Sequence, residues 1–108
     1  MAEDFFPVVA LYLNMIMSFK TPDLEFCFKN NHTGGKIPPD LAKRILRQLL
    51  AIDVAMDVND LRIPPGNHLE LLKGDREGQY SIRENKQYRL CFHFIDGNAF
   101  NVELADYL

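Results

Sequence analysis

The second half of the chain alternates apolar and polar residues with a period of two. The clearest run is YRLCFHFI at residues 88–95, whose even-numbered apolar residues share one face while Arg89, Cys91 and His93 share the other. Three shorter runs have the same period: HLELLK at 68–73, QYSIR at 79–83 and AFNVEL at 99–104. The pattern predicts four strands, joined by the turns GDREG, ENKQ and Asp-Gly-Asn.

The same alternation predicts which side chains meet the core. Besides the even-numbered apolar residues of 88–95, the inward set is Tyr80, Ile82, Phe100, Val102 and Leu104. The opposite face of the sheet, which carries Arg89 and His93, should be polar and open.

A helical period replaces the period of two in the first half. Apolar residues recur at helical spacing between about Pro38 and Met56, namely Leu41, Ile45, Leu49 and Ile52. The sequence Thr21-Pro22-Asp23 predicts the start of another helix, which should continue to about Asn30. A β-type segment, MIMSFK, precedes it at 15–20, and the Pro- and Gly-containing stretch 57–67 should be irregular.

These elements predict an α+β domain. Two N-terminal helices should pack on one face of a mainly antiparallel, four- to five-stranded sheet. We assign residues 15–108 to this single domain and residues 1–14 to an N-terminal extension of unknown role. The extension is compatible with an added strand, an ordered arm or sequence upstream of a start at Met15 or Met17.

Composition narrows the possible functions. No apolar run is long enough to span a bilayer, and acidic residues stand where a signal peptide would be basic, so we expect a cytoplasmic protein. The cysteines and histidines lack metal-ligand spacing, so no metal or other cofactor is expected. The net charge of −3 argues against nonspecific nucleic-acid binding. Residues 36–93 nevertheless contain ten Lys or Arg against eight acids, which allows a local basic surface.

Five ordered sequence elements resemble the HigB-type toxins of the RelE/ParE superfamily. They are MIMSFK (15–20), LAID (50–53), LRIPPGNHLELLKGDREGQYSIR (61–83), YRLCFHF (88–94) and the Asp-Tyr pair at 106–107. The resemblance covers nearly everything from Met15 onward. It implies a RelE-like fold and a metal-independent endoribonuclease that cuts messenger RNA in the ribosomal A site. It also implies inhibition by a HigA-like helix-turn-helix antitoxin, indirect association with operator DNA through that antitoxin, and no membrane partner.

The resemblance also assigns roles to individual residues. Lys73 and Arg89 occupy the positions of the family's phosphate-stabilising cations, while Asp106 and Tyr107 match the pair near its active site. Arg and Lys suit this role because both bind phosphate, Arg in a planar, bidentate manner. Beyond the resemblance, we predict RNA contacts at Arg76, Arg83 and His93, for which a solvated surface position is the alternative.

The chain departs from the family pattern at two positions. Related chains commonly have a histidine after the Asp-Tyr pair, whereas this chain has Leu108, which cannot transfer a proton. Some relatives have a histidine three residues before the cation at position 73, where this chain has Glu70.

The same residues and the same fold are also compatible with different roles. From the residues alone, Lys73 suits a soluble turn, Arg89 suits a cross-strand partner of an acid such as Glu103, and Asp106 suits an ion pair near a frayed terminus. A noncatalytic ParE-like gyrase inhibitor would share the fold. A degenerate toxin that only binds its antitoxin is the third possibility.

Overall fold

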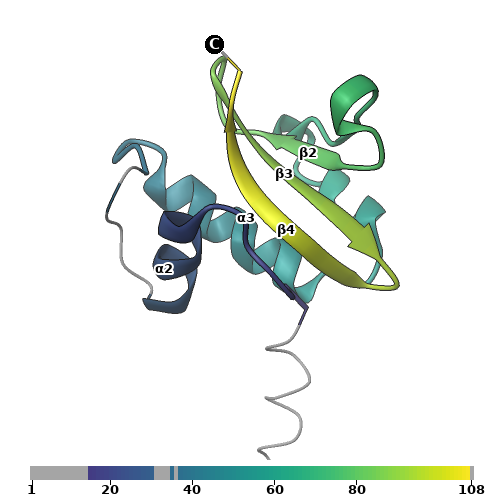
Figure 1. Ribbon diagram of the computed structural model, residues 1–108, viewed down its shortest axis with the longest axis horizontal. Helices are drawn as coiled ribbons and strands as arrows, with labels where there is room; N and C mark the ends of the chain where they lie inside the picture. The colour runs from purple at the N-terminus through teal and green to yellow at the C-terminus, as the bar shows by residue number, and fades with distance from the viewer. Residues whose placement is uncertain (1–14, 31–34, 36, 108) are drawn as a thin grey trace, which may run out of the picture.

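The computed structural model describes residues 15–30, 35 and 37–107, and Figure 1 shows their arrangement. Two α-helices come first, α2 (Pro22–Asn30) and α3 (Ala42–Val54). Four strands follow: β1 (Glu70–Leu71), β2 (Tyr80–Arg83), β3 (Tyr88–Ile95) and β4 (Asn98–Asp106). Three short 3-10 helices complete the described elements: η1 (Val58–Arg62), η2 (Pro65–Asn67) and η3 (Gly74–Arg76). The predicted extension at residues 1–14 lies outside the described residues.

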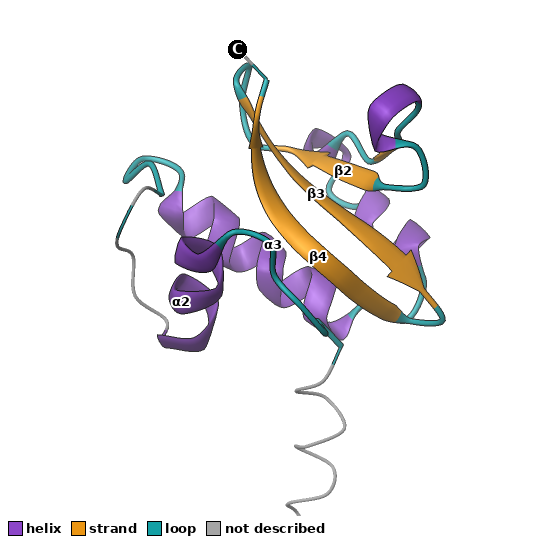
Figure 2. Cartoon of the chain, viewed as in Figure 1, coloured by secondary structure: helices purple, strands orange, loops and turns teal. Residues whose placement is uncertain are grey.

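The strands form one antiparallel sheet in the order β1-β2-β3-β4. The α-helices lie on one of its faces, as Figure 2 shows. Segment 15–20 runs along the free edge of β4, forming two isolated parallel bridges, Ile16–Ala99 and Phe19–Val102. The α+β prediction, with two helices on one face of a mainly antiparallel sheet, is therefore confirmed.

Both helices begin and end close to where their patterns predict. Pro22 begins α2, and the carbonyl of Thr21 accepts the Leu24 and Glu25 backbone N–H groups. The Thr21 hydroxyl accepts a bond from the Leu104 backbone N–H at 3.1 Å, which ties the start of α2 to β4. Helix α3 starts later than predicted, at Ala42, because residues 38–41 form turns instead. No helix in the described ranges has the length and apolar character needed to cross a bilayer.

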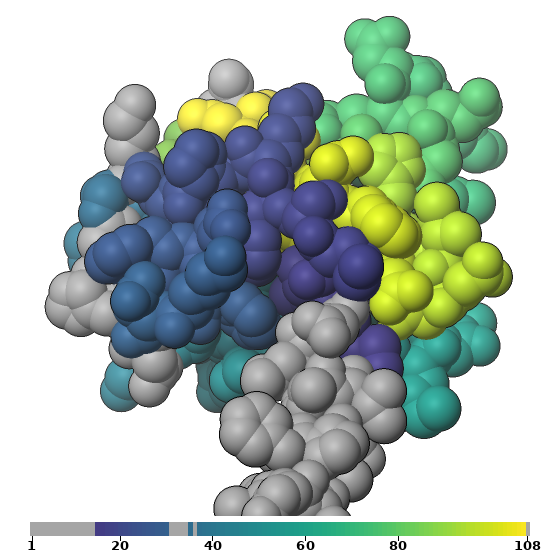
Figure 3. All heavy atoms as spheres, turned by 60° about the horizontal axis from the view of Figure 1, so that its bottom comes forward, coloured from purple at the N-terminus to yellow at the C-terminus, as the bar shows by residue number. Residues whose placement is uncertain are grey.

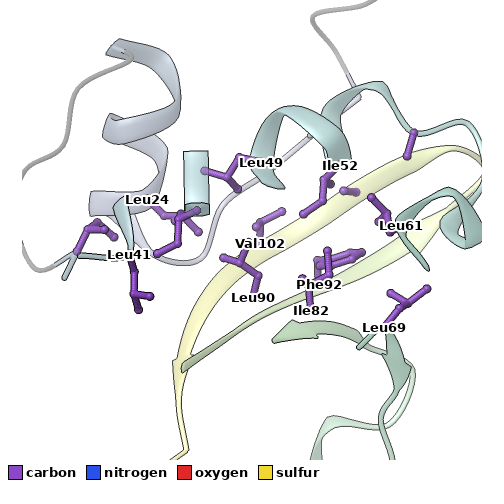
Figure 4. Packing of buried hydrophobic residues seen from close by; sticks show 14 of the residues in the cluster. Leu24, Leu41, Leu49, Ile52, Leu61, Leu69, Ile82, Leu90, Phe92 and Val102 are labelled. Atoms are coloured by element: carbon purple, nitrogen blue, oxygen red, sulfur yellow. The ribbon is translucent and has the colours of Figure 1, made fainter. Parts of the chain in front are cut away.

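The core lies between α3 and the inner face of the sheet. Leu49 and Ile52 of α3 face Leu90, Phe92 and Val102 of the sheet, as Figure 4 shows, and all five side chains are fully buried. Burying a side chain of this size stabilises the fold by roughly 1.5–3 kcal/mol. The period-two and helical patterns therefore identified the residues that hold α3 on the sheet.

The prediction that Phe100 points into the core is wrong. Cys91 pairs with Glu103 but His93 pairs with Phe100, so β4 contains one extra residue between these pairs. Asn101, in this bulge, has a φ of 54°. An extra residue reverses the alternation of side chains. Phe100 therefore lies on the outer face opposite His93, and Ala99 is buried in the core instead.

The first predicted strand is shorter than its pattern suggested. Of residues 68–73, only Glu70 and Leu71 form β1, pairing with Ser81 and Tyr80 of β2. By contrast, β3 has the predicted bounds, and β4 extends beyond them to Asp106. The longest strands, β3 and β4, thus supply most of the outer face of the sheet.

Candidate active site

Arg89 lies near the start of β3 on the outer face of the sheet, the face directed away from α3. Its guanidinium donates to Ser81 Oγ at 2.5 Å and to Glu70 Oε1 at 2.9 Å. The side chain is 19% exposed. These bonds to two neighbouring strands fix the guanidinium in position while leaving part of it accessible to a ligand.

Arg76 reaches the same face from η3. Gly74, with a φ of 69°, begins this turn, and a positive φ is a conformation that glycine adopts readily. The guanidinium makes a bidentate contact with Glu103, at 2.9 and 3.3 Å, and donates to Gln79 Oε1 at 3.1 Å. The hydrogen bonds between them raise the pKa of Arg76 and lower the pKa of Glu103, so the pair is ionised at neutral pH.

Tyr107, directly after β4, joins the two arginines. The Arg76 and Arg89 guanidinium carbons lie 6.0 and 5.9 Å from the centre of its ring. These distances are typical of cation–π contacts. We call Arg76, Arg89 and Tyr107 the outer-face cluster. A hydrogen bond from the Tyr107 backbone N–H to the Gln87 carbonyl, 2.7 Å long, holds this end of the chain in place.

The Tyr107 hydroxyl group lies 3.8 Å from the Cys91 sulfur. The residue as a whole is 47% exposed, but its hydroxyl end contacts a fully buried thiol. Burial accordingly raises the pKa of Tyr107, and the contact with Cys91 raises it further. Burial also raises the pKa of the Cys91 thiol. Both groups are therefore neutral at pH 7, so either can donate the hydrogen bond between them.

The structure brings only part of the predicted catalytic set together. Arg89 and Tyr107 are in contact, whereas Lys73, directly before η3, is exposed. Asp106 pairs with Tyr88 across β3 and β4, so its side chain points toward the face opposite Arg89, and it accepts bonds from Gln87 Nε2 at 3.2 Å. The catalytic roles of all four residues stay predictions.

The three predicted RNA contacts occupy different parts of the outer face. Arg76 belongs to the outer-face cluster itself. Arg83 is the direct partner of Arg89 in the β2–β3 register, and its Nε donates to the Asn85 carbonyl at 3.3 Å. His93 shares the face of Arg89 but lies four residues further along β3, roughly 13 Å away.

Four polar residues of the site were not assigned to it from the sequence. They hold the cluster in place: Glu70, Ser81, Cys91 and Glu103. The alternative partner proposed for Arg89 was Glu103, but Glu70 pairs with Arg89 and Glu103 pairs with Arg76. The strand register brings these residues to the site, since Glu70 lies opposite Ser81 and Cys91 lies opposite Glu103.

The chemistry available on this face is that of two fixed cations, a neutral phenol and flanking carboxylates. Among the described residues, no three His, Cys, Asp or Glu side chains gather closely enough to hold a metal ion. Two guanidinium groups beside one aromatic ring have the chemistry that suits contact with phosphate oxygens.

The fold and this cationic face define a RelE-like toxin, and the chain belongs to that family. Residues 17–107 match the family described as RelE-like toxin of type II toxin-antitoxin system HigB. The resemblance to HigB-type toxins is thereby confirmed.

Two named relatives cover most of the chain. Toxin HigB-1 of Vibrio cholerae serotype O1 is 42% identical over 90 residues, which span 83% of this chain and 95% of that protein. Endoribonuclease HigB of Proteus vulgaris is 39% identical over 93 residues, spanning 86% of this chain and 99% of the relative. An uncharacterized protein of Haemophilus influenzae is 43% identical over 86 residues, 80% of this chain and 85% of that protein.

Proposed function

We propose that this HigB-family endoribonuclease is a toxin that cleaves messenger RNA on translating ribosomes in the cytoplasm, using its own side chains rather than a metal ion. Family membership and the likeness to an endoribonuclease support the activity class. The observation that carries the proposal is the outer-face cluster, in which Arg76 and Arg89 both lie within about 6 Å of the Tyr107 ring centre.

Cleavage of RNA by its own 2′-hydroxyl group has three chemical requirements. The hydroxyl must lose a proton, the phosphorane-like transition state must be stabilised, and the leaving 5′-oxygen must gain a proton. Arg76 and Arg89 meet the second requirement, because their fixed guanidinium groups can donate to the phosphate oxygens where negative charge develops. Each arginine already has a carboxylate partner, which holds it in place before RNA arrives.

The proton transfers need other groups. The neutral phenol of Tyr107 can donate to a phosphate oxygen when it turns from the Cys91 sulfur. Lys73, exposed beside η3, can reach the phosphate with a flexible ammonium group, and Asp106 is the carboxylate that the family resemblance assigns to proton handling. In this proposal Lys73 joins the site when the ribosome orders the message, and Asp106, whose side chain points toward the opposite face, must turn toward the cluster to take part.

An antitoxin partner follows from membership of a type II toxin family. We expect a HigA-like helix-turn-helix protein that also links the toxin indirectly to operator DNA. Three apolar side chains in or just after the last turns of α3 are exposed among the described residues: Leu50, Val54 and Met56, at 52%, 57% and 83%. Exposed apolar side chains of this kind mark protein interfaces more often than nucleic-acid contacts.

The test maps message cuts on translating ribosomes for the wild type, Lys73→Ala and Arg89→Ala. Arg62→Ala is the matched control, since this exposed arginine lies on η1 outside the cluster. We expect cuts with the wild type and the control and a loss of at least tenfold with the variants. Growth arrest without message cleavage would reject the nuclease and favour a gyrase inhibitor. Unchanged cleavage in both variants would reject the site while sparing the activity.

A further inference from the structure

A second group of cations lines a groove beside the active face. The groove lies between α3, η2 and the turn that joins β2 to β3, with a volume of about 330 Å³. Its cationic lining residues are Arg44, Arg83 and Lys86, and the His68 side chain also lines it. Figure 1 shows the β2–β3 turn at the same end of the sheet as the C-terminal end of β4.

Arg44 is the fixed element of this groove. Its guanidinium donates to the Arg83 carbonyl at 3.1 Å and the Gly66 carbonyl at 3.3 Å, which anchors α3 to β2 and η2. Its Nε is buried and has no hydrogen-bond partner among the described residues, although Glu84 Oε1 lies 3.7 Å away. Because Glu84 is the only acid among the lining residues and is itself buried, the groove has a net positive charge.

Arg83 lines the groove and is also the strand neighbour of Arg89. Arg83 pairs directly with Arg89 across β2 and β3, so the Cα atoms of the two arginines are about 5 Å apart. From Arg83 the lining passes to Lys86 in the turn and Arg44 on α3. An RNA strand whose reacting phosphate sits at Arg89 can therefore place a neighbouring phosphate at Arg83 without crossing the sheet.

We infer that this groove binds a backbone phosphate of RNA next to the one that is cleaved, with Arg83 and Lys86 as its main contacts. The inference rests on the proposed function, because it takes the cluster at Arg89 as the site of cleavage. RNA is favoured over a protein partner because the groove is lined by cations, whereas the exposed apolar side chains at the end of α3 lie outside its lining.

The test measures binding of the intact chain to an oligoribonucleotide whose 2′-hydroxyl groups are methylated, which blocks cleavage, between 0.1 and 0.5 M salt. Arg83→Gln and Lys86→Gln are compared with Lys29→Gln, a control on the exposed end of α2. For single strands, each lost phosphate contact reduces the salt slope by about 0.7 and the affinity at 0.1 M salt about fivefold. We expect these changes in the groove variants and none in the control.

A parallel binding assay on ribosomes without message shows whether the phosphate comes from messenger RNA or from ribosomal RNA. A loss with the oligonucleotide supports message in the groove, and a loss with empty ribosomes alone supports ribosomal RNA in the same place. Unchanged slopes in both assays, or no detectable binding by the wild type, would overturn the inference. The inference would also be overturned if the groove variants bound RNA normally but failed to copurify with the antitoxin. The groove would then be a protein interface.

The experiments distinguish failure of the cleavage proposal from failure of the groove proposal. The oligonucleotide cannot be cut, so binding through the groove is measured without catalysis. Cleavage by the wild type with unchanged salt slopes would reject the groove and leave the nuclease intact. Absence of cleavage together with slopes that depend on Arg83 and Lys86 would reject the nuclease and leave the groove as a phosphate site.

Discussion

The carboxyl group of Glu84 is a sensitive probe of how burial shifts a pKa, because its side chain has no exposed surface. Burial raises its pKa from 4.5 to about 7, while Arg44 nearby partly opposes the shift. The side-chain amide of Gln48 lies against the carboxyl group. With its nitrogen donating to Asn67 Oδ1 at 3.1 Å, the amide directs its oxygen at Glu84, an arrangement that suits a protonated carboxyl.

The raised pKa makes the free energy of unfolding depend on pH in a definite direction. In the unfolded chain Glu84 ionises near pH 4.5, but in the folded chain it ionises near pH 7. The folded state therefore binds the proton more tightly, and stability falls as pH rises through this window. At about 1.4 kcal/mol per pKa unit, the full loss is about 3 kcal/mol.

Glu84→Gln removes the titration while keeping the shape of the side chain. Between pH 5 and pH 8, the stability of the variant relative to the wild type should rise by about 2 kcal/mol. Urea unfolding at both pH values measures this difference, and any constant cost of losing the Arg44 partner cancels. Glu77→Gln, at an exposed position, is the control. A stability difference that is the same at both pH values would show that Glu84 does not ionise between pH 5 and pH 8 in the folded protein.

Three further predictions concern the outer-face cluster. Arg76→Ala should lower the cleavage rate by roughly 10²- to 10³-fold through loss of transition-state stabilisation, and a rate close to that of wild type would exclude Arg76 from the chemistry. Tyr107→Phe should lower the single-turnover rate of cleavage about 10- to 100-fold, the value of a hydrogen bond to a charged group. Glu103→Gln should lower the free energy of unfolding by about 1 kcal/mol at pH 7. Because Arg76 lowers the pKa of Glu103, this stabilisation is lost as pH falls below about 4.5, so urea unfolding should show the difference shrinking toward pH 3.

Local patterns predicted most of the fold because burial there follows directly from periodicity. Alternation gave the bounds of β3, and helical spacing gave the buried face of α3. The error at Phe100 has a nonlocal cause, the bulge in β4, which depends on how that strand pairs with β3. The pairing of segment 15–20 with β4 could not be predicted either, since the bridged residues are 83 positions apart.

The candidate site was less predictable than the fold. The family resemblance identified Arg89 and Tyr107, which the structure places together. Arg76 was predicted only as an RNA contact, because the turn at Gly74 that carries Arg76 to Tyr107 has no periodic signal. The choice of acid for each arginine depends on strand register, which the sequence does not specify.

Segment 15–20 has a consequence for how a partner can bind. Figure 3 shows it between α2 and the β3–β4 hairpin, where the backbone N–H groups of Met17 and Lys20 donate to Ala99 and Val102. The long edge of the sheet is therefore already occupied at these positions, and the other edge, β1, is only two residues long. A partner that extends the sheet by adding a strand would have to displace this segment. We therefore expect an antitoxin to cover faces of this domain, and the segment to protect β4 from edge-to-edge aggregation while no partner is bound.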